Sequence, residues 1–211
     1  MVALGATVPA GAAILAVATM AILSGALHLD GLADTADALV PLRPEAAERA
    51  RKDPSIGVGG ATALVLVLGL EIASLATLAG ISGAFIAGLA CLAGGAVSRA
   101  VPVLVGRIAR SRAIGVGLGA AFAEQVTTGD AAIATLTALA VAGIATLAGG
   151  SPLLLAGSLV GVGAGVALGL AIVRLRHQLD GDGLGATVEL SFAATLLAAA
   201  WAAAVGRLPA A

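Results

Sequence analysis

The sequence predicts an all-α protein: a polytopic integral membrane helix bundle of about six transmembrane helices, forming a single membrane domain over residues 1–211. First, 60% of the residues are hydrophobic and only 11% are charged, against about 45–50% and about 25% in soluble domains. Second, the mean hydropathy is +1.09. Third, the charges lie in islands between apolar stretches long enough to cross a bilayer as helices. A soluble globular fold is therefore excluded.

Composition also excludes other classes of protein. The net charge of −1 argues against nucleic-acid binding, which normally uses a surplus of basic residues. The single cysteine, Cys91, allows neither a disulfide framework nor a cysteine-based metal site. The abundant glycine and alanine suit close packing of helices in lipid, where small side chains let backbones approach each other.

The apolar stretches predict the order of the elements. The expected spans cover approximately residues 8–27, 58–79, 83–105, 131–149, 153–173 and 190–206. The first has no charged residue before it and is too long for a signal peptide, which needs a positive N-terminal region and a shorter apolar core. Two connections, at 80–82 and 150–152, are very short.

The other three connections are long and polar, and with about six spans they fall on one side of the membrane. These expected loops cover residues 28–57, 106–130 and 174–189. All Lys and Arg residues except Arg207 lie in or beside them. The positive-inside rule then makes this side cytoplasmic. We therefore expect a multi-pass protein of the cell (inner) membrane, embedded in the lipid bilayer, with its chemistry at the cytoplasmic face.

The acidic segment after the first span is the most informative part of the chain. Asp30, Asp34 and Asp37 are spaced four and three residues apart, so on a helix they share one face. Three neighbouring carboxylates repel one another unless a cation neutralises them, and hard oxygen ligands select Mg²⁺ or Mn²⁺. The alternative is a solvated acidic helix start, which explains one or two of these residues but not three on one face.

Two further polar segments flank membrane spans. In residues 51–60, Lys52 could hold phosphate oxygens and the glycines could let a ligand approach the backbone; the segment also fits a basic turn at the interface. The cluster in residues 177–189, with Asp180, Asp182 and Glu189, could supply a second set of metal ligands or be an ordinary glycine-rich turn. Both segments lie on the predicted cytoplasmic side.

Two charged residues lie inside predicted spans, where charge defaults to a functional hypothesis. Arg99 lies about two turns from the cytoplasmic end of its helix, and snorkelling to the interface is the alternative. Glu71 lies near the membrane centre and would be costly unless protonated or paired; no partner for it is evident in the sequence. His28 is better interpreted as a hydrogen-bonding residue than as a metal ligand, because no His/Cys set accompanies it.

Together these segments resemble the cobalamin synthase family (adenosylcobinamide-GDP ribazoletransferase). The family patterns are G-x-L-H-x-D-G-x-A-D-x-x-D, K-D-x-x-I-G-x-x-G, S-R, G-L-G-x-x-F and G-D-x-L-G-A-x-x-E. They are matched in order by residues 25–37, 52–60, 98–99, 117–122 and 181–189. The ordered set makes the resemblance specific, although each pattern alone is weak.

The chain departs from the family pattern at a few places. Ser55 stands where arginine is frequent, and Asp180 stands where threonine is usual. Family members usually carry another apolar segment ahead of the acidic segment's helix, so a truncated or mis-started reading frame is one interpretation of the short N-terminus.

The resemblance implies a Mg²⁺-dependent transferase in the last steps of adenosylcobalamin synthesis. Its substrates would be adenosylcobinamide-GDP and α-ribazole or its 5′-phosphate, with release of GMP. Asp30, Asp34 and Asp37 would hold Mg²⁺, and Asp182 would complete a second metal site or act as general base. Lys52 and Arg99 would hold phosphate oxygens, Asp53 would orient them, and His28 would contact substrate. Asp34, Asp37 and Asp182 would thus be the catalytic residues.

Other functions compete with this one. The acidic segment weakly resembles the D-G-x-x-A-R core of CDP-alcohol phosphotransferases, but Asp34 stands where that core has arginine. A cation-coupled transporter could use membrane carboxylates, yet transporters usually place such sites near the midplane. The sequence does not determine the oligomeric state, and a homo-oligomer is one of the options.

Overall fold

The chain folds into long helices. The structure, a computed structural model, describes residues 2–40, 55–112 and 117–206, and no strand occurs in these ranges. The helices are α1 (Val2–Leu23), α2 (Leu27–Leu39), α4 (Val58–Ser82), α5 (Ala84–Ile108), the 3-10 turn η1 (Arg110–Arg112), α6 (Leu118–Gln125), α7 (Thr128–Gly149), α8 (Leu153–Arg176) and α9 (Gly181–Val205).

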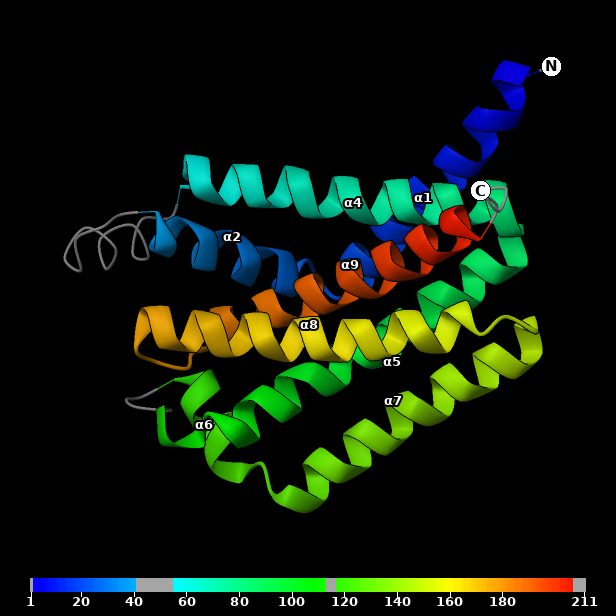
Figure 1. The fold of residues 1–211 in the computed structure, drawn as a ribbon. Helices are drawn as coiled ribbons and strands as arrows, with labels where there is room; N and C mark the ends of the chain where they lie inside the picture. The colour runs from blue at the N-terminus through cyan, green and yellow to red at the C-terminus, as the bar shows by residue number, and fades with distance from the viewer. Residues whose placement is uncertain (1, 41–54, 113–116, 207–211) are drawn as a thin grey trace.

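The described helices confirm the predicted fold class. Five of them, α4, α5, α7, α8 and α9, are long and apolar enough to cross a membrane, and the bent pair of α1 and α2 would make a sixth span. Their axes run between two ends of the bundle (Figure 1). One end holds the C-terminus of α2 and the N-termini of α4 and α9, together with η1 and α6. We call it the charged end, because Arg107, Arg110, Arg112, Arg174 and Arg176 lie in the helix ends and turn there.

The first predicted span differs from the structure. The helix expected over 8–27 ends at Leu23, and the chain bends by 90° into α2. Gly25 and Ala26 take positive φ angles of 59° and 56° at the bend, a conformation that ends a helix. The loop expected over 28–57 therefore begins as a helix, which packs against α4 and α9 inside the bundle.

Two other expected loops are also shorter than predicted. The loop expected over 174–189 ends where α9 begins at Gly181, because the Asp180 carboxylate accepts the backbone N–H of Gly183 at 2.9 Å and caps the helix. The loop expected over 106–130 contains the helix α6. It ends at Thr128, where α7 begins, and Thr127 and Asp130 form a capping box at the N-terminus of α7. The polar residues that cap α7 and α9 were predicted to lie in loops, and in the structure they form the starts of these helices.

Helix α9 is the central element of the bundle, in contact with α2, α4, α5 and α8 (Figure 1). Its approach to α8 depends on small residues. Along α8, Gly157, Gly161, Gly165 and Gly169 each face the backbone or a small side chain of α9 so closely that a Cβ atom would contact it. Without side chains at these positions the two helices can pack at close range, as small residues permit in lipid.

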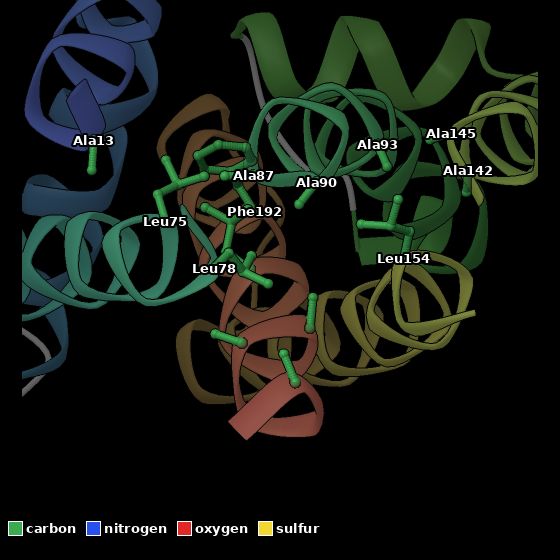
Figure 2. Close-up of a cluster of buried hydrophobic side chains, with 14 of the residues drawn as sticks. Ala13, Leu75, Leu78, Ala87, Ala90, Ala93, Ala142, Ala145, Leu154 and Phe192 are labelled. Carbon is green, nitrogen blue, oxygen red and sulfur yellow. The ribbon is translucent and has the colours of Figure 1, made fainter. Parts of the chain in front are cut away.

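The largest hydrophobic cluster joins helices from both ends of the sequence. Leu75 and Leu78 of α4 lie beside Ala87 of α5 and Phe192 of α9 (Figure 2). Leu78 and Leu154 are 0% and 1% exposed. The cluster holds α9 between α4, α5 and α8, and so fixes the helix that carries Asp182 and Glu189.

Candidate active site

A cavity of about 400 Å³ lies toward the charged end of the bundle, where α2, α5, α6 and α9 meet. His28 and Asp30 of α2, Arg99 of α5 and Asp182 of α9 line it. The structure thus brings together predicted site residues from three separate segments of the chain. The remaining wall is mainly apolar: Leu27, Pro102, Val103, Leu118, Phe122, Leu184 and Val188.

Close backbone contact between α2 and α9 places the two acidic segments side by side. A Cβ atom on Gly31 would lie 2.9 Å from the backbone oxygen of Asp182 and 3.3 Å from the Cα of Gly185. Only glycine permits this approach without a shift of the helices. Asp182 takes part in this contact and Asp30 is next to Gly31 in the chain, so both aspartates line the same cavity.

Asp34 lies one turn beyond Asp30 on α2, in a field made by other carboxylates. The negative charges of Asp30, Asp182 and Asp37 all act on it, and Arg176 partly offsets them. The aspartates of α2 thus form one acidic stretch, and Asp182 of α9 adds to it. Such a concentration of negative charge favours a bound cation.

Asp37, predicted as a catalytic and metal-binding residue, accepts two backbone hydrogen bonds that the sequence did not predict. Its Oδ2 accepts the backbone N–H of Gly57 at 2.7 Å, and its Oδ1 accepts that of Gly60 at 2.8 Å. These are donors that the first turn of α4 leaves without intrahelical partners, so Asp37 caps α4 from another helix. The glycines that were expected to admit a ligand instead admit this carboxylate: a Cβ atom on Gly60 would lie 2.5 Å from Oδ2 of Asp37.

Arg99 and His28 are linked to Glu189 of α9, which belongs to the cluster predicted over 177–189 but is not among the predicted catalytic or binding residues. The Nδ1 atom of His28 lies 3.9 Å from Oε1 of Glu189 on α9. Arg99 donates from Nη1 to the Ser98 hydroxyl at 2.8 Å, and its charge acts on both His28 and Glu189. The family pattern ends on Glu189, which was the available signal for it.

Two predicted site residues, Lys52 and Asp53, lie outside the described residues. The segment that follows them does lie near the site, because Gly57 and Gly60 bind Asp37 at the C-terminal end of α2. Phe122, from the pattern at 117–122, lines the cavity although the sequence analysis gave it no role.

The acidic side of the cavity has the ligand chemistry of a partial magnesium site. In the ranges 2–40, 55–112 and 117–206, no group of three or more His, Cys, Asp and Glu side chains is placed for metal binding. Mg²⁺ bound with substrate phosphates usually takes only one or two protein carboxylates and keeps several waters. Asp30, Asp34 and Asp182 offer hard oxygen atoms of the right type around one stretch of the site. Their chemistry fits Mg²⁺ held partly by substrate.

Comparison with known proteins shows similarity over nearly the whole chain. The profile of the family described as cobalamin-5-phosphate synthase matches residues 1–200. A relative from Frankia casuarinae, named adenosylcobinamide-GDP ribazoletransferase, is 36% identical over 203 residues, covering 88% of this chain and 69% of the relative.

Two further relatives carry the same name. The one from Sinorhizobium medicae is 36% identical, with 90% of this chain and 73% of the relative covered. The one from Thermococcus kodakarensis is 34% identical, with 82% of this chain and 70% of the relative covered. No solved structure matches the chain.

Proposed function

The chain belongs to the cobalamin-5-phosphate synthase family, and from that premise we propose that the cavity between α2, α5, α6 and α9 is where it carries out its reaction. The activity is that of an adenosylcobinamide-GDP ribazoletransferase in the final step of cobalamin synthesis. In full, adenosylcobinamide-GDP reacts with α-ribazole, or its 5′-phosphate, to give adenosylcobalamin, or its phosphate, and GMP.

The single observation that carries the location is the convergence of His28, Asp30, Arg99 and Asp182 on one cavity. A volume of about 400 Å³ lies within the usual range for small-molecule sites. The apolar wall around Pro102, Val103 and Phe122 would receive the aromatic base of α-ribazole. Its ribose would then face the acidic side of the cavity.

In the reaction, a ribose hydroxyl oxygen forms a bond to the phosphorus that carries the cobinamide arm, and the bond from that phosphorus to the GMP oxygen breaks. GMP leaves with the electron pair of the broken bond. The Asp182 carboxylate takes the proton of the attacking hydroxyl, as a general base positioned in the cavity wall. Arg99 holds phosphate oxygens by charge-assisted hydrogen bonds, and His28 contacts substrate beside it.

Asp30 and Asp34 would hold Mg²⁺ together with the substrate phosphates. When bound, Mg²⁺ would neutralise the developing negative charge on the phosphates. Lys52 and Asp53 would bind and orient the phosphates from the segment before α4. Asp37 contributes through the start of α4, since its two carboxylate oxygens bind Gly57 and Gly60.

We place the cavity on the cytoplasmic side, because the charged end carries the arginines that the positive-inside rule assigns to the cytoplasm. Ser111, in the arginine-rich turn η1, is exposed. In a Ser111→Cys variant of a Cys91→Ala background, a membrane-impermeant maleimide should label inverted vesicles and not intact cells. Labelling of intact cells would overturn this orientation.

The proposal is tested with the full chain purified into lipid nanodiscs. Supplied with adenosylcobinamide-GDP, α-ribazole and Mg²⁺, it should form GMP and cobalamin in equal amounts, followed by chromatography, and EDTA should stop both. Asp34→Asn should abolish turnover while leaving the thermal unfolding midpoint unchanged. Turnover by Asp34→Asn near the wild-type rate would contradict the site.

A further inference from the structure

A pair of acidic side chains lies behind the cavity wall, in the interior of the bundle. Glu71 of α4 is 1% exposed. It forms a side-chain hydrogen bond with Glu189 of α9, which is the partner that the sequence did not reveal. The other oxygen, Oε1 of Glu71, has no hydrogen bond within the described part of the chain. The proposed function does not use Glu71.

A hydrogen bond between two carboxyl groups needs a proton on one of them, because a carboxylate can only accept. Burial disfavours the charged form, and Glu71 is the more deeply buried partner: the side chain of Glu189 is 14% exposed. Glu189 also has the positive charge of Arg99 near it. The deeper burial of Glu71 and the Arg99 charge beside Glu189 favour the proton on Glu71, which would donate, and the negative charge on Glu189, which would accept.

Glu189 connects this pair to the cavity. Its Oε1 lies 3.9 Å from Nδ1 of His28, and His28 and Arg99 both line the cavity. A second, smaller cavity of about 20 Å³ is lined by Ser24, Glu71, Arg99 and Glu189. That volume suffices for one water, which would serve the unpaired Oε1 atom of Glu71.

We propose that Glu71 is a positioning residue: its carboxylic acid donates a hydrogen bond that fixes the Glu189 carboxylate, and Glu189 in turn orients His28 and Arg99 toward the substrate. This inference rests on the proposed function for the identity of the substrate. It assigns unequal roles to the two glutamates. Glu71 needs only a donor, whereas Glu189 needs its negative charge.

Three variants distinguish these roles. Glu71→Gln keeps a donor toward Glu189 and should retain kcat/KM within about threefold of wild type. Glu189→Gln removes the charge that faces Arg99 and His28, and should lower kcat/KM about 10- to 100-fold, as loss of a supporting partner commonly does. Glu71→Leu removes the donor, and should lower kcat/KM about as much as Glu189→Gln does. Glu71→Gln supplies a donor at the same position, and should therefore restore the activity that Glu71→Leu loses. Glu124→Gln, an exposed carboxylate on α6, is the matched control and should be unchanged.

Equal losses in Glu71→Gln and Glu189→Gln would overturn the proposal, as would full activity of Glu189→Gln. Both changes are close in size to glutamate, so the test stands even if Glu71→Leu fails to fold. Inactive wild-type protein would instead contradict the proposed function, which separates the two failures.

Infrared spectroscopy tests the proton directly and needs no turnover. The wild-type protein should show the carbonyl band of a buried protonated carboxylic acid, shifted in D₂O. The band should persist in Glu189→Gln and in the Glu124→Gln control, and it should be absent from Glu71→Gln. A band unchanged in Glu71→Gln would place the proton elsewhere and refute the assignment.

Discussion

Asp30 and Asp37 lie at opposite ends of the short helix α2, and the fold uses them differently. Asp37 gives both carboxylate oxygens to backbone N–H groups at the start of α4. Asp30 lines the cavity that Asp182 lines from α9. One helix thus carries a carboxylate that holds the fold and another that faces the proposed substrate.

The start of α9 repeats this division two residues apart. Asp180 caps the helix through the Gly183 N–H and pairs with Arg176 at 2.7 Å, while Asp182 lines the cavity. Carboxylates at helix starts are stabilising by themselves. The comparison teaches that position in the tertiary structure, and not residue type or spacing, separates the aspartates that cap helices from those that line the cavity.

The largest expected effect comes from removing a cavity carboxylate. Asp182→Asn should lower the rate of GMP release by about 10²- to 10⁴-fold, the usual contribution of a general base. The measurement is GMP release under saturating substrates, normalised to folded protein. Near-normal release would place the general base on another residue.

Removing a structural carboxylate should instead affect stability. Asp37→Ala leaves the N–H groups of Gly57 and Gly60 without their acceptor, and should lower the free energy of unfolding by about 2 kcal/mol. Denaturant unfolding in detergent micelles measures this. Asp182→Asn is the comparison, and an equal loss of stability in both variants would remove the distinction between the two aspartates.

Gly60, which packs against the Asp37 carboxylate, gives a third, smaller effect. Gly60→Ala would bring a Cβ atom to 2.5 Å from the Asp37 carboxylate, and should cost about 1–3 kcal/mol as overpacking. Gly69→Ala, on the same helix with nothing within 4 Å, is the matched control and should be neutral or slightly stabilising. The thermal unfolding midpoints of the two variants, measured together, test this expectation. Equal changes in the two midpoints would argue that the close contact between Gly60 and Asp37 does not hold Asp37 in place.

The smallest effect is expected at a helix cap that does not line the cavity. Thr127→Ala removes the capping box of α7, where the Thr127 hydroxyl accepts the Asp130 N–H at 3.1 Å. It should cost about 1 kcal/mol of stability and leave GMP release per folded protein unchanged. A loss of activity here would show that any destabilised helix start impairs the reaction, and would weaken the contrast between Asp30 and Asp37.

Much of the fold could be predicted from the sequence, because apolar stretches of membrane length dictate helices wherever they occur. The break after Leu23 could not, since no charge or proline marks it and only the backbone of Gly25 and Ala26 turns the chain. The start of α9 was missed because a polar cap such as Asp180 looks like loop.

The site residues that could be predicted are those that belong to a sequence pattern within one segment of the chain. Asp30 and Asp182 belong to such patterns, and both line the cavity. The task of Asp37 depends on Gly57 and Gly60 of another helix, and the partner of Glu71 lies on α9. These are tertiary contacts, which periodicity and spacing within one segment do not encode.

The most direct test of the division between the two kinds of aspartate is GMP release per folded protein in Asp30→Asn and Asp37→Asn, measured together with Mg²⁺ and both substrates in nanodiscs. We expect Asp30→Asn to lose nearly all turnover with an unchanged unfolding midpoint. Asp37→Asn should unfold more easily and keep most of its turnover. Turnover lost in Asp37→Asn and kept in Asp30→Asn would contradict the account.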